Sequence, residues 1–345
     1  MESCDDEKDG GYENLMPKAL SPGVASGGAK FVDEVLNGQD ECCLDNFWMD
    51  KNVFYKLCQV LQSRGLLRHT NGIKIEEQLA IFLFIIGHNL RTQAVRELFR
   101  YSGETISRHF NNVLIAITAV SLDFFQPPKS DVPQEVLENP RLYPYFKDCV
   151  RAVDCIPFLV TVAVDEQGPF RNKNSLLMQN VQLVHLTSSR HYLVDTKSVN
   201  LPGFLSPYHD VPYHLNGLPG DRHLQDAKDV FNQWHSLLRN SMNRIFSALK
   251  ARFPILTSTP PYPLQTQVKL VVTGCAIHNY IHIEKPDDWL FRRFEHGDVM
   301  QMDDALPSVE VEQPMFFENQ DLDFPFVTED LEMSLQLRDL LATEM

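Results

Sequence analysis

The sequence has no run of eighteen or more apolar residues, no Cys-x-x-Cys pair and no glycine-rich phosphate-binding loop. These absences argue against a membrane-spanning helix, against a zinc ribbon or dithiol redox site, and against nucleotide hydrolysis. The first residues, Met1 to Glu7, are acidic and lack the basic and then apolar pattern of a secretory signal. We therefore expect a protein that is neither secreted nor inserted in a membrane, whose seven cysteines are reduced thiols.

An excess of positive charge is also missing, because the formal net charge of the 345 residues is -15. Taken alone, this value argues against a dedicated nucleic-acid binder, since contacts with phosphates require local positive charge. The charge is unevenly distributed, however. Residues 284–345 contain 17 acids and 4 bases, a net of -13, so the preceding residues sum to only -2. Nucleic-acid binding by the body of the chain therefore stays open.

Composition and periodicity divide the chain into four segments. Residues 1–40 are rich in glycine and acids and have no long apolar periodicity, so they predict a disordered leader. Residues 41–125 predict a helical domain, and residues 145–283 an α/β domain in which short apolar runs precede long helices. Residues 284–345 predict an acidic, largely disordered tail. A proline-rich connector separates the two domains.

Residues 92–117 have the spacing of a helix-turn-helix unit. Residues 92–100 predict one helix, residues 101–103 a tight turn, and residues 104–117 a second helix with an apolar face. Candidate contacts with phosphates and base edges are Arg91, Arg96, Arg100, Arg108, His109 and Asn112. The alternative is a plain helical hairpin with a solvated polar face, since neighbouring glutamates dilute the positive charge.

Two aspartates end apolar, strand-like runs of the second domain. Asp154 follows Ala152-Val153, and Asp195 follows Leu193-Val194. Carboxylates at the ends of adjacent strands are a usual way to hold Mg²⁺ or Mn²⁺, because these ions prefer oxygen ligands. On spacing alone, two surface acids that cap loops are the alternative.

The sequence pattern also predicts the elements of this domain. The predicted strands are Cys149–Val153, Phe158–Val164, Val181–Leu186 and His191–Val194. A long helix is predicted over Asp226–Phe253, and a last buried segment over Val268–Ile283.

Several longer motifs of this domain resemble the Harbinger transposase-derived nucleases of the DDE superfamily. Phe146-Lys147-Asp148-Cys149 leads to Asp154, as in the first acidic segment of that family. Further motifs are similar to the plant branch of proteins like Antagonist of Like Heterochromatin Protein. They cover residues 165–174, 179–181, 202–208, 231–240, 249–256 and 275–281. The resemblance runs from about residue 44 to about residue 283.

The resemblance implies an RNase H-like fold behind a helix-turn-helix domain, with acids that bind two Mg²⁺ or Mn²⁺ ions for phosphodiester cleavage. Asp154 matches the family's first acid and Asp195 the acid of its Leu-Val-Asp motif. A further family acid has no counterpart, because a stretch between the strands is absent. The acid of the long helix is replaced by Asn243, which offers a neutral carbonyl oxygen and no charge. The domain is therefore predicted to be internally shortened, catalytically inactive, and a weak binder of metal or none.

We therefore expect a domesticated, nuclease-like protein of the nucleus that acts as a protein-interaction or chromatin-associated factor. The resemblance implies DNA and chromatin or Polycomb-type proteins as partners, and no membrane. The alternative is a divalent-metal-dependent endonuclease that uses Asp154, Asp195 and another acid, Asp165 or Asp210. A third hypothesis is a sequence-reading DNA binder that acts through residues 91–117.

Two smaller features have competing interpretations. His278 and His282 stand one helical turn apart, which predicts a packed or capping role rather than a metal site, because no third ligand is evident. The acidic tail interleaves acids with phenylalanines, and Leu331 to Leu341 has helical leucine spacing. Such a segment either folds on a partner surface or remains solvated.

Overall fold

The structure is a computed structural model. It describes residues 27–70, 72–125, 134–140, 142–152, 156–163, 165, 167–171, 177–181, 191–194, 204–211, 226–296 and 328–345. The chain divides into two compact units, which are treated separately. Unit 1 comprises Met1–Phe125, Leu159–Ala163 and Ser247–Ser308, and unit 2 comprises Gln126–Phe158, Val164–Phe246 and Val309–Met345.

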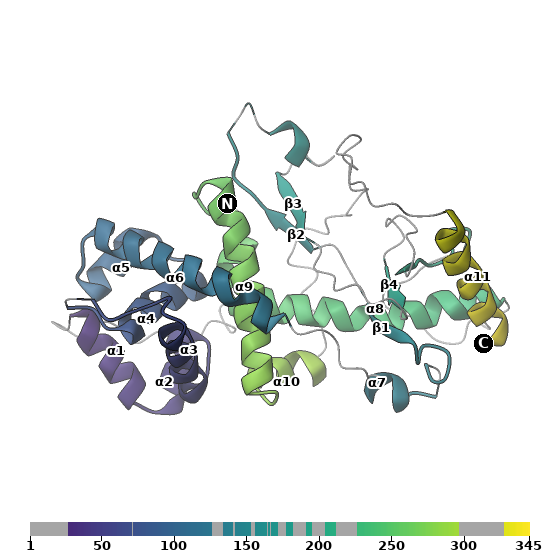
Figure 1. The fold of residues 1–345 in the computed structure, drawn as a ribbon, viewed down its shortest axis with the longest axis horizontal. Helices are drawn as coiled ribbons and strands as arrows, with labels where there is room; N and C mark the ends of the chain where they lie inside the picture. The colour runs from purple at the N-terminus through teal and green to yellow at the C-terminus, as the bar shows by residue number, and fades with distance from the viewer. Residues whose placement is uncertain are drawn as a thin grey trace, which may run out of the picture. The chain divides into compact units, whose positions relative to one another are not determined.

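Unit 1 is mostly helical (Figure 1). Its helices are α1 (Gly28–Asn37), α2 (Asp40–Phe47), α3 (Lys51–Ser63), α4 (Ile75–His88), α5 (Thr92–Phe99), α6 (Gly103–Phe124), α9 (Leu264–Glu284), α10 (Trp289–His296) and a 3-10 turn over Pro254–Thr257. Asp50 caps the start of α3, since its carboxylate accepts a hydrogen bond of 2.8 Å from the Asn52 amide.

The core of unit 1 is built around α4, which is buried on nearly all sides. The apolar run Leu79 to Ile86 makes it a central helix rather than an amphipathic surface helix. Gly87 allows the closest contact, because a Cβ at that position would overlap the ring of Trp48. The indole of Trp48 in turn stacks on Trp289, with ring centroids 6.5 Å apart. The core therefore joins residues that are far apart in the sequence.

The predicted disordered leader and tail need correction at their inner ends. Residues 28–37 form α1, whose buried face consists of Phe31, Val32, Val35 and Leu36. These apolar residues lie at i, i+4 spacing over a single short helix, which is too brief for a long periodic pattern. Residues 289–296 form α10, which buries Leu290 and Phe294 beside Ala248. Both helices belong to the core of unit 1.

Helices α6 and α9 are the main pair of unit 1. Ring contacts join Phe110 to Tyr262 at a centroid distance of 5.5 Å, and Phe124 to Tyr280 at 4.7 Å. Between them, the hydroxyl oxygens of Thr118 and Thr273 are 3.2 Å apart. Because sequence numbers rise together along both helices, α6 and α9 run parallel.

Unit 2 contains a small parallel sheet with strand order β1-β4-β5. The strands are β1 (Cys149–Ala152), β4 (His191–Leu193) and β5 (Phe204–Leu205); a separate two-stranded sheet joins β2 (Ile156–Leu159) and β3 (Met178–Val181). The predicted strand over residues 158–164 is therefore shifted towards the N-terminus. Residues after Leu159 leave the strand, because the side chain of Gln267 hydrogen-bonds both the amide and the carbonyl of Thr161, at 3.0 and 2.7 Å. The described residues thus contain little sheet.

The long helix α8 (Ala227–Arg252) confirms the predicted helix to within a residue at each end. Its first half packs on the parallel sheet, since Phe231, Trp234 and Leu238 belong to one cluster with Cys149, Leu193 and Leu205. The ring of His235 is 3.1 Å from the carbonyl oxygen of Leu205. Short helix α7 (Gln134–Leu137) adds Val136 to the same cluster.

The prediction of a disordered tail is also wrong for its last residues. Helix α11 (Thr328–Glu344) packs against β5, and Ala342, 3% exposed, lies in the core cluster of unit 2. Leu337, Leu341 and Met345 pack against the same cluster. The leucine spacing noted in the sequence thus finds its apolar partner surface within the same chain. In the described parts of the chain, no helix is long and apolar enough to span a membrane.

Candidate functional site

The two candidate metal-binding acids, Asp154 and Asp195, lie outside the described residues. The strands that precede them are described. Strands β1 and β4 are parallel neighbours, and Ala152 at the end of β1 is paired with Leu193 at the end of β4. In sequence, Asp154 follows two residues after Ala152, and Asp195 two residues after Leu193. The two acids therefore follow paired positions of adjacent strands.

The third candidate position, Asn243, lies on α8 and is partly buried. No Asp or Glu occurs from Val230 through Ile283, so neither the rest of α8 nor α9 before its last residue supplies a carboxylate. Among the described residues, no group of three or more His, Cys, Asp or Glu side chains is arranged to hold a metal ion. A two-metal centre needs several converging carboxylates, and the described part of the chain brings no such group together.

Asp210, another acid weighed for such a centre, is engaged elsewhere. Asp210 is exposed and forms an ion pair of 2.6 Å with Lys228.

The two histidines of α9 contact the same aromatic ring. His278 is buried and its ring contacts Phe291, as does the ring of His282. Burial, together with the nearby charge of Arg252, lowers the pKa of His278 well below its usual 6.5. These contacts show that His278 has the packed environment that its spacing predicts.

The predicted helix-turn-helix spacing is confirmed by α5 and α6, which are separated by a tight turn at residues 100–102. Arg100 ends α5 in the left-handed region, with φ of 57°. Ser102 caps α6, because its hydroxyl accepts a hydrogen bond of 3.1 Å from the Thr105 amide. The turn is also tied to the core, since the hydroxyl of Tyr101 donates a hydrogen bond of 2.9 Å to Glu77 on α4.

Five of the six candidate nucleic-acid contacts of this unit are exposed. They are Arg91, Arg96, Arg100, Arg108 and Asn112. The sixth, His109, is 2% exposed, and burial together with the charge of Arg108 lowers its pKa. Its assignment as a contact residue is therefore wrong for this conformation. His109 is a polar residue beside the apolar stripe of α6, so the sequence pattern places it on the solvent side. In the structure its side chain is buried.

Glu77, which holds the turn, is a buried acid that the sequence gives no reason to single out. It is 2% exposed, and its second carboxylate oxygen has no hydrogen-bond partner among the described residues. Burial raises the pKa of Glu77 above its usual 4.5, an effect that outweighs the opposing hydrogen bond from Tyr101. The folded state therefore holds this proton more tightly than the unfolded chain does. The contribution of Glu77 to stability is therefore fullest below about pH 4.5 and is lost as the pH rises through the pKa of Glu77 in the folded state.

We expect Glu77→Gln to be more stable than the wild type by about 1 kcal/mol near neutral pH, because an amide does not have to ionise in the core. The gain should vanish below the usual carboxyl pKa of 4.5, where both side chains are neutral. Urea unfolding at several pH values measures it. Glu97→Gln, at an exposed position of α5, is the matched control and should show no such pH-dependent gain. A wild type and a Glu77→Gln variant with identical pH profiles would contradict the assignment.

A further cluster in unit 1 was not predicted from the sequence. The guanidinium of Arg252 is fully buried, forms an ion pair with Asp288, and donates a hydrogen bond to the carbonyl oxygen of Trp48. It also lies over the ring of Phe291, 5.2 Å from its centroid. Trp48 lies 204 positions before Arg252, and Asp288 lies 36 positions after it, so no local sequence pattern predicts this cluster.

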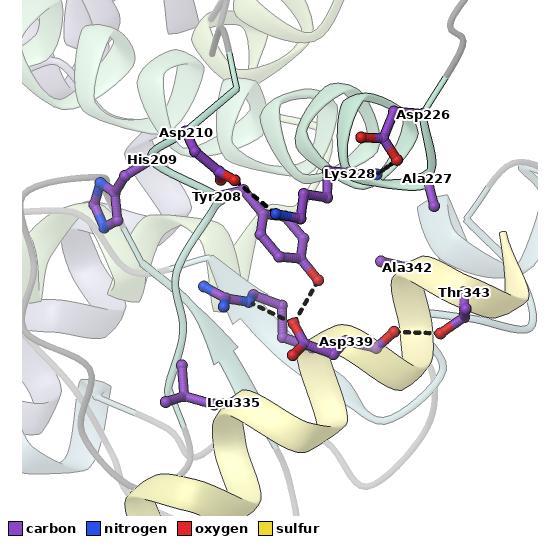
Figure 2. Close-up of a pocket in the computed structure, with 11 residues that line it drawn as sticks. Tyr208, His209, Asp210, Asp226, Ala227, Lys228, Leu335, Asp339, Ala342 and Thr343 are labelled. Carbon is purple, nitrogen blue, oxygen red and sulfur yellow. Dashed lines mark hydrogen bonds and ion pairs between the residues drawn. The ribbon is translucent and has the colours of Figure 1, made fainter.

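A hollow in unit 2 is the other feature that the sequence did not reveal (Figure 2). It is lined by Tyr208 and its neighbours, by the start of α8 and by one face of α11. The Tyr208 hydroxyl donates a hydrogen bond of 2.6 Å to Asp339, and the Arg338 guanidinium lies 4.1 Å from the centre of the Tyr208 ring. Lys228 lies 5.1 Å from the same centre. The only signal in the sequence was that Pro207-Tyr208 closes one of the longer motifs.

Comparison with known families assigns the two regions of the chain separately. Residues 157–279 match the family described as DDE superfamily endonuclease, and residues 25–119 match the family described as domain of unknown function (DUF8040). No curated protein and no solved structure matches the chain. The chain thus combines a mostly helical N-terminal region with a region that matches a DDE superfamily endonuclease domain. Asp195 and Asn243 fall inside the second match, and Asp154 precedes it by three residues.

Proposed function

We propose that the protein is a transposase-derived, nuclease-like factor of the Harbinger type that has lost cleavage and acts at DNA or chromatin in the nucleus. The match to a DDE superfamily endonuclease supports the origin. The long motifs that resemble the plant branch of proteins like Antagonist of Like Heterochromatin Protein support the finer assignment. Chromatin or Polycomb-type proteins, in addition to DNA, are the partners this proposal implies.

One observation carries the proposed loss of cleavage. Helix α8 packs against β4 and β5 of the parallel sheet, and the residue that stands at the family's helix-acid position is Asn243. From Val230 to Arg252 this helix carries four cations and no carboxylate. Cleavage by two metal ions needs converging negative charge to hold strongly hydrated Mg²⁺. Asp154 and Asp195 alone are too few for that task.

The test is nicking of supercoiled plasmid by the purified full chain in Mn²⁺. We expect no nicking above the metal-free control, and no difference between the wild type and Asp154→Asn. The competing endonuclease hypothesis predicts nicking that requires Mn²⁺ and is abolished by Asp154→Asn. Such a result would replace the inactive assignment. In the same assay, gain of cleavage by Asn243→Glu would show that the remaining scaffold is intact.

A second candidate function, contact with DNA through α5 and α6, is favoured by the exposure of four arginines around one capped turn. Arg91 and Arg100 flank α5, Arg96 lies in its last turn, and Arg108 lies in the first half of α6. Exposed cations around a helix-turn-helix turn suit phosphate contacts, which supply most of the salt-dependent affinity for DNA.

We expect Arg108→Ala to weaken binding of a labelled DNA duplex and to lower the slope of log affinity against log salt by about 0.9, the contribution of one phosphate contact. Fluorescence anisotropy over a salt series measures both. Arg64→Ala is the matched control, because Arg64 is equally an exposed arginine, lies at the end of α3 and pairs with Asp123 at 2.7 Å. Equal effects of the two substitutions would show that only net charge matters and that this face makes no specific contact.

A further inference from the structure

The parallel sheet of unit 2 places the ends of its strands at one edge. Ala152 is paired with Leu193, and Leu193 with Leu205, so the carboxyl ends of β1, β4 and β5 lie in register. We call this row of strand ends the carboxyl edge; it consists of Ala152, Leu193 and Leu205. In open parallel sheets, ligands bind beyond the carboxyl ends of the strands. A nucleic acid that meets unit 2 is therefore expected at this edge.

The chain beyond the carboxyl edge is held rigidly at Tyr208. Tyr208 follows the last residue of β5 by three positions. Its amide donates a hydrogen bond of 2.8 Å to the side chain of Asn232 on α8, which in turn donates one of 3.0 Å to the Tyr208 carbonyl oxygen. Tyr208 is 5% exposed. It therefore provides a fixed anchor next to the end of β5.

Helix α11 is fastened to this anchor (Figure 2). Asp339 accepts the hydrogen bond of the Tyr208 hydroxyl, and the Arg338 guanidinium stacks on the face of the ring. On the apolar side, Leu337, Leu341 and Ala342 pack into the cluster that contains Leu205 and Phe231. The other side of the helix faces solvent, since Leu340 is 54% exposed. One face of α11 is thus held on unit 2 by a few apolar side chains and by the hydrogen bond between Tyr208 and Asp339.

The charge of α11 is opposite to what a nucleic-acid surface requires. Its sequence contains five acids and one base, namely Glu329, Asp330, Glu332, Asp339, Glu344 and Arg338. The base is engaged with Tyr208, and Lys228 at the start of α8 is engaged with Asp210. Phosphates approaching the end of β5 therefore meet net negative charge and cations that are already paired.

Helix α11 also lies outside the DDE superfamily match, which ends at residue 279. In the sequence, residues 297–327 separate the end of α10 from the start of α11. We propose that α11 is an autoinhibitory cover, which docks at the carboxyl edge through Tyr208 and keeps nucleic acid from unit 2. Undocking exposes the edge and raises affinity for DNA. This inference rests on the proposed function, in which the protein acts at DNA.

The experiment compares DNA binding by the full-length wild type and by a release variant, Leu337→Asn with Leu341→Asn. Hydrogen exchange of the α11 amides reports whether the helix is docked. We expect faster exchange of α11 in the release variant and about tenfold tighter binding of a labelled DNA duplex at low salt, the middle of the usual range of couplings between sites. Leu340→Asn is the matched control on the exposed side of the same helix and should leave both readings unchanged.

Tyr208→Phe provides a milder second variant if the release variant loses the fold of unit 2. It keeps the ring and removes only the hydroxyl that holds Asp339, so we expect the same direction of change with a smaller size. Equal affinity of the wild type and of a variant in which α11 exchanges rapidly would overturn the autoinhibitory cover while leaving the DNA contact in place. Absence of DNA binding by every variant at low salt would instead refute the DNA contact of the proposed function, and the cover with it.

Discussion

Asp288→Ala is expected to lower the free energy of unfolding of unit 1 by about 3–5 kcal/mol, because it leaves the guanidinium of Arg252 charged, buried and without its counter-ion. Both side chains of this pair are essentially inaccessible, at 0% and 1% exposure. Removing one partner of a buried ion pair costs more than the pair itself contributes, since the remaining charge keeps its desolvation penalty. Urea unfolding followed by circular dichroism measures the loss.

The neighbouring residue supplies the control for this prediction. Asp287 forms an ion pair of 3.0 Å with Arg292, but both side chains are more than 60% exposed. Water screens this pair, so Asp287→Ala should change stability by less than about 1 kcal/mol. The double substitution Arg252→Met with Asp288→Leu should recover much of the loss, because it removes both buried charges. If Asp288→Ala and Asp287→Ala lower the free energy of unfolding by the same amount, the buried ion pair does not hold α8, α10 and the end of α2 together.

Ile281→Asp on α9 is expected to cost more than about 4 kcal/mol and to unfold α6 together with α9, because it removes a fully buried side chain and places a carboxylate in the core. Helix α9 covers α6 over much of its length, from Phe110 to Phe124. The helix-turn-helix unit therefore depends on a helix encoded about 150 residues later. Loss of helical signal and of protection of the α6 amides from hydrogen exchange would show this dependence.

Ile283→Asp is the matched control, since Ile283 lies two residues further along the same helix and is 47% exposed. It introduces the same charge near the helix C-terminus, which costs about 0.3–1 kcal/mol through the helix dipole. An intact α6 in the Ile281→Asp variant would contradict the interdependence of α6 and α9. In that case residues 41–125 would behave as the separate helical domain that composition predicts.

Local pattern predicted those elements that local physics determines. The two helices around residue 101 and the limits of α8 follow from side-chain periodicity. The ends of the chain were predicted less well. Helices α1 and α10 are short, and these two helices and α11 each bury only one narrow face, so composition outweighed their spacing in the prediction.

The residues of the candidate site also fall into those that local pattern predicts and those that tertiary packing decides. Sequence alone identified the arginines of α5 and α6 that the structure shows to be exposed, because this prediction depends on residue type at known spacing. The replacement of a family acid by Asn243 stays a prediction. The sequence could not place His109, whose burial is set by the packing of α6 in the core. Nor could it find the ion pair of Arg252 with Asp288 or the anchor of Tyr208 with Asp339, because each joins side chains far apart in the chain.

The sequence by itself determined the charge distribution, the helix-turn-helix spacing, the relation to DDE superfamily nucleases and the lack of acids from Val230 through Ile283. These properties depend on the kind of residue and its order along the chain. Only the tertiary structure decided that α9 completes the helical unit and that α11 docks beside β5. The physical reason is that burial is a property of the surface that a side chain meets, and a one-dimensional pattern shows a helix face but not the partner that covers it.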